Sequence, residues 1–472
     1  MQDITKEISD LLWGLPMIIL LLGTHIYLTI RLKFPQRKIF TAIKLSVKKD
    51  KNAAGDVSQF AALATSLAAT IGTGNIIGVA TAVSLGGPGA VLWCWLTGVF
   101  GIATKYGEGL LAIKYRVKTK KGRMLGGPMY ALERGLGMKW LAVLFCVFTS
   151  VAAFGIGNTV QANAISENVS LLLKDSFDPM YTKVVVGVII AMLVGLVIFG
   201  GVKSIAKVCT SFVPAMSLFY VLGCIFILIV NHAYVGRALS EIVRGAFTND
   251  ALIGGTAGTT IMIAARFGIA RGLFSNESGM GSAPIVAAAA QTRNPVRQAL
   301  VSSTGTFWDT VVICAMTGLV IVTCILAHPD IDYKDGGLLT KEAFATIPYV
   351  GTPILTIGII TFAFSTILGW CYYGERAVEY LSGQRGIRIY RVFWTGAIVL
   401  GAIMGLGFVW NISDIMNALM TIPNLVALIL LSGVIAKDTQ YYLWEKRLDE
   451  DMAESSEPTP QINLNKRNNK HK

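Results

Sequence analysis

The sequence predicts an all-α polytopic membrane protein with eleven transmembrane helices. Charged residues make up only 15% of the chain, whereas ordinary globular proteins carry about 25%. Long uncharged stretches recur, and each approaches or exceeds the ~18 residues that cross a bilayer core. The Lys and Arg residues alternate between rich and poor loops, as in proteins that cross a membrane repeatedly. These three observations exclude a soluble domain.

The uncharged stretches give the crossings in order. Their predicted centres lie near residues 20, 72, 97, 155, 192, 219, 262, 313, 361, 401 and 425. The first stretch, Leu11 to Ile30, is expected to be retained in the mature chain. The ten residues before it hold three acids and one lysine, whereas a signal peptide begins with basic residues. Arg31 and Lys33 follow it, where a cleavage site would have small residues.

The basic residues predict the orientation of the helices. Segments on one side of the predicted membrane hold 33 Lys and Arg residues, and segments on the other side hold 7. Because cytoplasmic loops are enriched in Lys and Arg, the N-terminus is predicted outside and the C-terminus inside the cell membrane. The net charge of +13 is explained by these loops, and we expect no nucleic-acid partner.

Cysteine and histidine give no sign of metal or redox chemistry. The seven cysteines are scattered, mostly within apolar stretches, and form no C-x-x-C motif. The four histidines form no H-x-x-x-H motif. We therefore expect no disulfide, no resident metal and no zinc enzyme.

One crossing is predicted to be interrupted. Residues 251–265 and 278–292 are each 15 residues long, which is too short to cross unaided. Counting them as two crossings would also place the arginines after Gly374 and the basic C-terminus outside. We therefore treat them as one crossing, whose second piece contains Pro284 and continues toward the inside.

The ten helices after the first divide into two groups of five that begin with opposite orientation. The first group spans residues 59–231 and the second spans 251–436. Residues 1–58 add one extra helix with a basic loop, and residues 437–472 form a polar cytoplasmic tail that is predicted to be disordered. Both groups open with a glycine-interrupted helix. Such helices at matching positions of inverted repeats indicate the central site of a transporter, because unwound backbone exposes carbonyls for cations and amides for carboxylates.

The stretch ATIGTGNIIG in the first of these helices leaves two interpretations open. A nucleotide-binding loop is excluded, because that motif follows a strand and opens a helix. Gly74 and Gly78 form a small-xxx-small pair that is typical of close helix packing. Thr70, Thr73 and Asn75 instead favour an unwound segment, because polar groups at membrane depth need partners.

Two further helices carry polar side chains at membrane depth. Asn158 and Gln161, in GIGNTVQAN, share a helix face and fit either interhelical hydrogen bonds or contact with a polar ligand. Ser365 and Thr366 fit either hydrogen bonds to their own helix or, as a pair facing unwound backbone, the binding of a hard cation. Trp370, one turn further on, fits packing, an interface position or a pocket wall.

Three acidic residues also lie at or near membrane depth and are candidates for function: Asp309, Glu108 and Glu277. Lys105 can pair with Glu108, and an arginine of the preceding helix can pair with Glu277. Asp309 has no evident partner in the sequence.

Several motifs in the same order resemble the alanine/glycine:cation symporter family of bacterial and archaeal amino-acid transporters. The similarity covers residues 59–436 and is carried by AATIGTGNIIGVATA, GGPGAVLWCW, GNTVQAN, RGLFSNESGMGSA and AFSTILGWCYYGERA. The resemblance implies the five-plus-five inverted-repeat fold of the bacterial leucine transporter, with one extra N-terminal helix. It also implies sodium-driven import of a small neutral amino acid, with alanine, glycine and glutamine as candidates.

The resemblance also implies site residues by position. Sodium is expected at the backbone carbonyls of Ala68 and Ile71 and at the hydroxyls of Ser365 and Thr366, and Asn75 is expected to touch a second cation. The substrate carboxylate is expected at the unwound amides of the first broken helix. The implied substrate-binding residues are Thr70, Thr73, Gly74, Asn75, Gln161, Thr259, Met262, Ile263 and Trp370.

The coupling ion and mechanism stay open at this point. We expect alternating access, with an amino acid and Na+ as cargo, no organic cofactor and no obligate protein partner beyond the bilayer. Proton coupling is one alternative, and an ion channel is a second, because channels also use broken helices. An intramembrane enzyme is remote, because the chain has no paired catalytic His or Asp motif.

Overall fold

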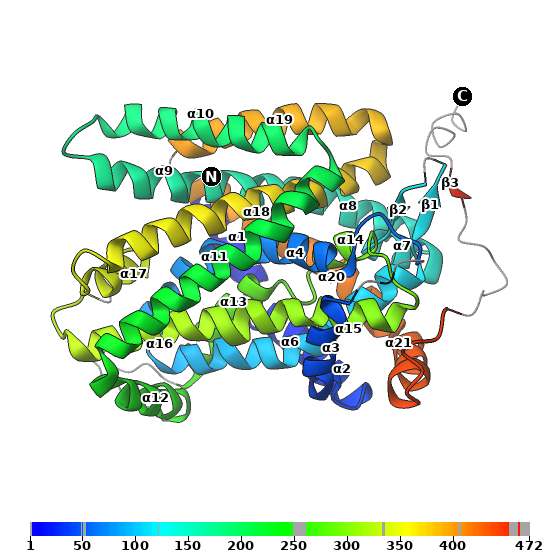
Figure 1. Ribbon diagram of the computed structural model, residues 1–472, viewed down its shortest axis with the longest axis horizontal. Coiled ribbons are helices and arrows are strands. Elements are labelled where there is room, and N and C mark those ends of the chain that lie inside the picture. The colour runs from blue at the N-terminus through cyan, green and yellow to red at the C-terminus, as the bar shows by residue number, and fades with distance from the viewer. Residues whose placement is uncertain are drawn as a thin grey trace.

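The computed structural model describes residues 2–48, 50, 53–120, 122–248, 261–332, 336–404, 407–452 and 461–462. Within these residues the protein is helical apart from three short strands (Figure 1). The strands form one small sheet of order β2-β1-β3, with β1 antiparallel to β2 and parallel to β3. Their bounds are Val117–Thr119 for β1, Met124–Leu125 for β2 and Gln461–Ile462 for β3.

The helices before residue 249 form the first half of the chain. Their bounds are α1 (Gln2–Leu12), α2 (Leu15–Arg31), η1 (Pro35–Lys38), α3 (Ile39–Ser46), α4 (Gln59–Thr70), η2 (Gly74–Gly78), α5 (Val79–Gly86), α6 (Gly89–Lys114), α7 (Pro128–Tyr130), η3 (Ala131–Gly135), α8 (Lys139–Phe154), η4 (Gly155–Thr159), α9 (Val160–Leu173), α10 (Pro179–Ile198), α11 (Val202–Val230) and α12 (His232–Phe247).

The helices after residue 260 form the second half. Their bounds are α13 (Ile261–Asn276), α14 (Ala283–Ala287), α15 (Pro295–Thr306), η5 (Phe307–Cys314), α16 (Ala315–Ala327), α17 (Gly336–Ala345), α18 (Gly351–Ser382), α19 (Gln384–Ile403), α20 (Gly407–Leu430), α21 (Ser432–Thr439) and η6 (Gln440–Trp444). Residues 437–444, in the segment expected to be disordered, therefore lie in α21 and η6.

The described helices include eight that are long and apolar enough to cross a membrane, and one bent pair raises this number to nine. The bent pair is 59–70 with 74–86, which meet at an angle of 56°. Helix α6 carries the charges of Lys105 and Glu108, and α13 has only 16 residues, so neither is among these spans. The predicted polytopic membrane protein is confirmed, whereas the count of eleven stays a prediction.

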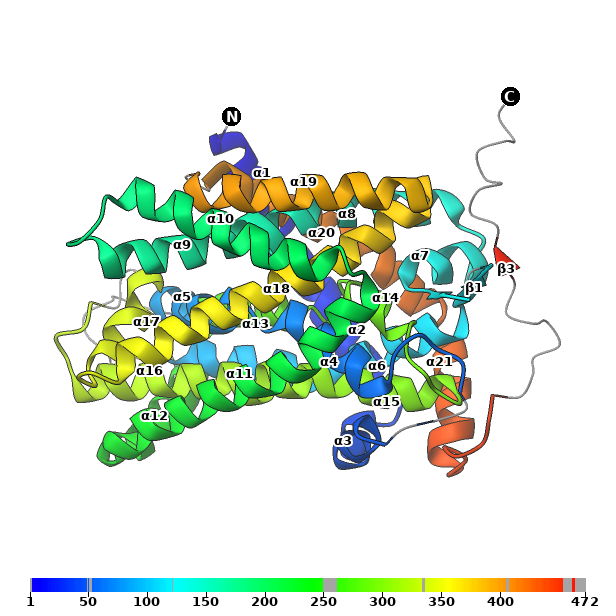
Figure 2. The same cartoon turned by 45° about the horizontal axis from the view of Figure 1, so that its top comes forward.

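The connecting segments gather at the two ends of the helical body. Figures 1 and 2 show α12, α17 and the α9–α10 turn at one end, and α7, the strands and α21 at the other. The segments at the first end belong to the set predicted to be poor in Lys and Arg, and those at the second end belong to the rich set. These segments of the two sets therefore lie at opposite ends, and the sidedness of the helices stays a prediction.

Small residues allow the first broken helix to lie against α18. Five alanines of α4 are buried, and α4 packs directly on α18. At Gly369 of α18, a Cβ atom would lie 2.5 Å from the backbone nitrogen of Ala69. No side chain fits there, because real atoms do not approach so closely and a packed backbone cannot move freely.

This contact predicts the effect of one added methyl group. Gly369→Ala should destabilise the protein by about 1–3 kcal/mol, the usual cost of overpacking a helix contact. The measurement is the melting temperature of the purified protein in detergent. Gly78→Ala is the matched control, because a Cβ there would meet no atom within 4 Å. Equal melting temperatures for both variants would contradict the packing argument.

Candidate functional site

The first broken helix opens directly after Thr70, where α4 ends. Ile71 is extended, with φ −75° and ψ 98°. The amide of Gly72, which would bond the Ala68 carbonyl in a continuous helix, donates instead to Asn75 Oδ1 at 2.8 Å. Asn75 therefore replaces one helical hydrogen bond and leaves the Ala68 carbonyl without its usual helical donor.

One hydroxyl of the predicted α18 pair faces this break. Thr366 Oγ1 donates to the carbonyl of Ile71 at 3.1 Å and lies 3.0 Å from the carbonyl of Phe362. Ser365 Oγ donates to Phe362 O at 2.9 Å. The structure therefore brings the predicted cation ligands Ile71 and Thr366 together, while Ser365 has the alternative bond to its own helix. Ala68, Ile71, Ser365 and Thr366 are all buried.

Gln161 touches the break from a third helix. Its Oε1 accepts from the amide of Thr73 at 3.4 Å, and its Nε2 donates to Ile156 O at 2.9 Å. Asn158 points elsewhere, because its Nδ2 donates to Trp394 O on α19 at 2.8 Å. The two amides that were expected to share one face therefore serve different contacts, and only Gln161 reaches the predicted site.

The remaining predicted residues of the first broken helix are buried but differ in their contacts. Thr70 Oγ1 donates back to Ser66 O at 2.7 Å. Thr73 and Gly74 line a cavity. Gly78 lines the same cavity, and a Cβ there would meet no atom within 4 Å. The packing interpretation of Gly78 is therefore not supported.

Asn75 is a partner of Asp309 that the sequence did not reveal. Asn75 Nδ2 donates to Asp309 Oδ1 at 2.6 Å, and Ser275 Oγ and Thr310 Oγ1 donate to Asp309 Oδ2 at 3.1 and 2.6 Å. Asp309 is fully buried in the π-helical segment η5. The π-helical segments η2 and η4 also lie beside the break, and such segments often mark functional sites.

The second broken helix is interrupted at a later point in the sequence than the predicted pocket residues, Thr259, Met262 and Ile263. Its break covers residues 277–282, where Glu277, Gly279 and Gly281 have φ of 54°, 90° and 86°. Phe274 and Ser275, directly before it, lie against Gly74.

The structure does not bring the predicted pocket residues of this helix to the break. Met262 is 68% exposed, and Met262 and Ile263 lie in the first turn of α13. At about 1.5 Å per residue, Met262 is roughly 20 Å along the helix from Ser275. Thr259 lies outside the described residues.

The expected ion pairs of the buried acids are replaced by hydrogen bonds. Glu108 Oε1 accepts from the amides of Gly279 and Gly281 at 3.1 and 3.0 Å and from Asn424 Nδ2 at 2.7 Å. Lys105 Nζ has no hydrogen-bond partner among the described residues. Glu277 accepts from Ser282 Oγ at 2.5 Å and from Trp370 Nε1 at 3.0 Å. Glu108 thus supports the second break, and Trp370 connects that break to α18.

A cavity of about 680 Å³ leads to the first break. It is bordered by α9, α13, α17, α18 and one residue of α20. Arg271 and Asp414 are opposite charges on its wall. The cavity runs toward the end of the molecule that holds α17, so the Thr73–Gly74 backbone is reached from that end.

The opposite end is closed by direct backbone pairing, which we call the seam. The seam joins residues 54–59, which lead into α4, to residues 288–292, which follow α14. Val57 bridges Ala290, and the amide of Asp56 donates to Ala289 O at 2.7 Å. Arg116 bonds carbonyls of both strips, and burial lowers its pKa to about 10. Arg116 therefore stays charged at neutral pH and holds the two strips together.

Comparison with known proteins identifies close relatives. The chain matches the sodium:alanine symporter family over residues 1–456. It is 48% identical over 448 residues to the sodium/alanine symporter AgcS of Methanococcus maripaludis, covering 93% of this chain and 97% of that protein. It is 36% identical over 462 residues to the "Probable sodium/glutamine symporter GlnT" of Bacillus subtilis, covering 96% and 93%. The crystal structure of MhsT in complex with L-phenylalanine matches with a TM-score of 0.59 and 14% identity, over 83% of this chain and 94% of that one. That likeness shows a shared fold.

Proposed function

This chain belongs to the sodium:alanine symporter family, and from this premise we propose that it imports alanine, glycine or glutamine together with Na+ by alternating access. It is a multi-pass membrane transporter and not an enzyme. The names of the relatives support sodium as the coupling ion, and they include both alanine and glutamine as cargo. Proton coupling is the alternative, and uptake driven by a sodium gradient or by a proton gradient distinguishes the two.

The proposed topology counts eleven crossings. It adds α6 and the α13–α14 pair to the nine apolar spans, and it divides the chain into an extra helix with a basic loop (1–58), two inverted repeats (59–231 and 251–436) and a cytoplasmic tail (437–472). Because the Lys- and Arg-rich segments lie at one end, that end is proposed to be cytoplasmic and the N-terminus extracellular.

The proposed ion site uses the oxygen atoms beside the first break. The carbonyls of Ala68 and Ile71 and the hydroxyls of Ser365 and Thr366 are hard oxygen donors, which suit an alkali cation at unwound membrane backbone. The 3.1 Å contact between Ile71 O and Thr366 Oγ1 is the observation that carries the proposal. It places two of the four donors together at the level where the helix is open.

The proposed substrate site lies where the cavity meets the break. In this proposal the amides of Thr73 and Gly74 bind the substrate carboxylate. Gln161, whose Oε1 accepts from the Thr73 amide, then holds a polar group of the substrate. Three further residues are proposed to line the substrate site: Thr70 and Asn75 from the first broken helix, and Trp370 from α18. Phe274 takes the place that Met262 and Ile263 were expected to fill, because it packs on Gly74 and lines the cavity.

The two ends of the site support alternating access. The cavity reaches the break from the proposed extracellular end, whereas the seam closes the proposed cytoplasmic end. This arrangement corresponds to a state that takes up cargo from outside. Release to the cytoplasm then requires the seam to open, because the inner halves α4 and α14 both lead into it.

Uptake by the purified protein in proteoliposomes tests the proposed function. A panel of labelled amino acids is offered with an inward sodium gradient, with a proton gradient and with neither. We expect accumulation of alanine, glycine or glutamine that depends on the sodium gradient. Uptake driven equally by the proton gradient alone, or unaffected by sodium, would overturn sodium coupling.

The ion site predicts the effect of removing one hydroxyl. Thr366→Ala should raise the sodium concentration for half-maximal uptake by about tenfold, since one charge-assisted contact is lost, while the order of preferred amino acids stays the same. Thr361→Ala is the matched control, because Thr361 lies on the same helix and, within the described part of the chain, its hydroxyl bonds Ile357 O and Gly358 O of its own helix. Unchanged sodium activation in Thr366→Ala would remove this residue from the ion site.

The substrate site predicts a role for Gln161. Gln161→Ala should raise the apparent substrate constant by about tenfold, the effect of one lost hydrogen bond in a buried site. Asn158→Ala provides the comparison, because it loses an interhelical bond away from the break and should lower the melting temperature with the substrate constant unchanged. If Gln161→Ala behaves in the same way as Asn158→Ala, Gln161 serves packing alone.

A further inference from the structure

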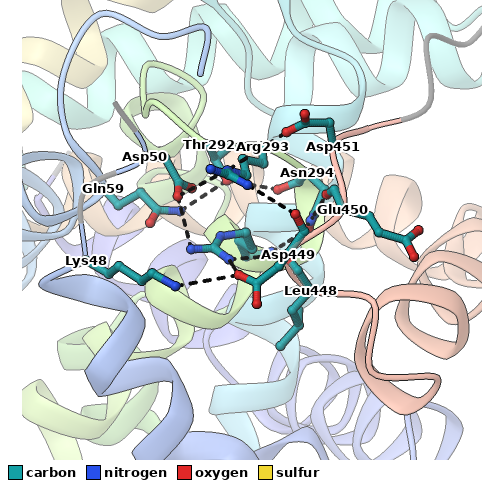
Figure 3. Close-up of polar contacts among 11 residues, drawn as sticks. Lys48, Asp50, Gln59, Thr292, Arg293, Asn294, Leu448, Asp449, Glu450 and Asp451 are labelled. Atoms are coloured by element: carbon teal, nitrogen blue, oxygen red, sulfur yellow. Dashed lines mark hydrogen bonds and ion pairs between the residues drawn. The ribbon is translucent and has the colours of Figure 1, made fainter. Parts of the chain in front are cut away.

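The segment that follows η6 lies against the cytoplasmic end of the second repeat. We call residues Leu448–Met452 the C-terminal strap. Figure 3 shows Leu448, Asp449, Glu450 and Asp451 beside Asn294 and Arg293, at the point where the chain passes from the seam into α15. The amide of Met452 donates to Arg293 O at 2.9 Å. The strap is therefore held by specific contacts far from its place in the sequence.

Backbone and side chain both fasten the strap to the start of α15. Asn294 Nδ2 donates to the carbonyls of Leu448 and Glu450, each at 2.9 Å. Arg297 Nη1 donates to Asp449 Oδ1 at 2.7 Å and to Leu448 O at 3.2 Å. Charge-assisted bonds of this kind are shorter and stronger than neutral ones.

The same arginine also contacts the segment that leads into the first broken helix. Arg297 Nη2 lies 3.1 Å from Asp50 Oδ1, and Lys48 Nζ lies 3.6 Å from Asp449 Oδ1. Arg293 Nε lies 3.7 Å from Asp50 Oδ1 (Figure 3). One charge cluster thus joins the chain before α4, the start of α15 and the strap.

The members of the cluster differ sharply in exposure. The side chains of Arg297 and Asp50 are 1% and 2% exposed, whereas that of Asp449 is 79% exposed. The Arg297 guanidinium and Lys48 hold the pKa of the Asp449 carboxyl below its ordinary value. Asp449 therefore stays charged at neutral pH, and because most of its side chain is already in water, it can leave the cluster while Asp50 continues to pair with the buried Arg297.

We propose that the C-terminal strap is a releasable brake on cytoplasmic opening, in which Asp449 and the strap carbonyls hold Arg293 and Arg297 directed at Asp50. This proposal rests on the proposed alternating access. When the inner half of α4 leaves α14, the seam parts and Asp50 moves away from Arg297. The strap opposes that movement because it fixes the orientation of both arginines and adds the Lys48 contact.

A native cysteine reports this opening. Cys209 is 1% exposed on α11, the helix that packs on α4, so movement of α4 uncovers its thiol. Cys224 is fully buried further along the same helix and serves as the internal reference. The full chain in lipid nanodiscs is labelled with a polar maleimide, and the rate at each cysteine is read by peptide mass spectrometry.

Asp449→Asn, and a chain that ends at Arg447, should each raise the labelling rate at Cys209 about threefold to tenfold, the size expected for a partly exposed charge pair. The rate at Cys224 should not change. Glu450→Gln is the matched control: it removes the same charge from the strap, but its side chain contacts only Tyr441 among the contacts described, and the backbone carbonyl is kept.

An unchanged or lower Cys209 rate in both variants would overturn the brake. A rise in Glu450→Gln equal to that in Asp449→Asn would also overturn it, because net charge alone would then explain the effect. Sodium-driven uptake is measured on the same wild-type protein. If this uptake is absent, the proposed function fails while the Cys209 comparison still tests the strap; if it is present and Cys209 does not respond, the strap alone fails.

Discussion

Within a bilayer, each backbone amide and carbonyl must find its partner in the protein itself, because no water is present to supply one. A helix that opens at membrane depth is therefore possible only where side chains replace the lost bonds. Asn75 does so for the amide of Gly72 in the first broken helix. Glu108 does so for the amides of Gly279 and Gly281 in the second. The central part of the fold depends on these side chains, which replace the missing backbone acceptors.

The hydrogen bond from the Gly72 amide to Asn75 has a chemical consequence at the first break. Because the Gly72 amide is diverted to Asn75, the Ala68 carbonyl lacks its helical donor, and the Thr366 hydroxyl of α18 lies beside the carbonyl of Ile71. Asn75 is in turn held by Asp309, which also accepts from Ser275 directly before the second break. One buried carboxylate therefore accepts hydrogen bonds from both broken helices.

The cytoplasmic end is held together by a different kind of interaction. There the seam pairs the backbone of buried residues, and the strap adds Asp449, a charged group at the edge of water, where an exposed ion pair is weak and easily exchanged. At membrane depth the bonds are short, buried and costly to break. A transporter needs both kinds, because its site must keep its shape while one of its ends opens. The placement of an exchangeable contact at the strap and strong contacts at the breaks meets this requirement.

Hydrophobic stretches, loop charges and glycine positions are local properties, so they sufficed to predict a polytopic helical protein and the two broken helices. The placement of Ile71 beside Thr366 was implied only by the resemblance to a known family. Contacts between distant segments were beyond them. The sequence offered Lys105 as the partner of Glu108, but the amides of the second break occupy that carboxylate, and Asp309 found its partners 234 residues away at Asn75. The pocket residues at Met262 and Ile263 were placed more than a dozen residues early, because glycine marks several positions where a helix can open and only the surrounding donors and acceptors select one of them. The strap could not be foreseen either, since a polar tail acquires structure only when Asn294 and Arg297 are folded beside it.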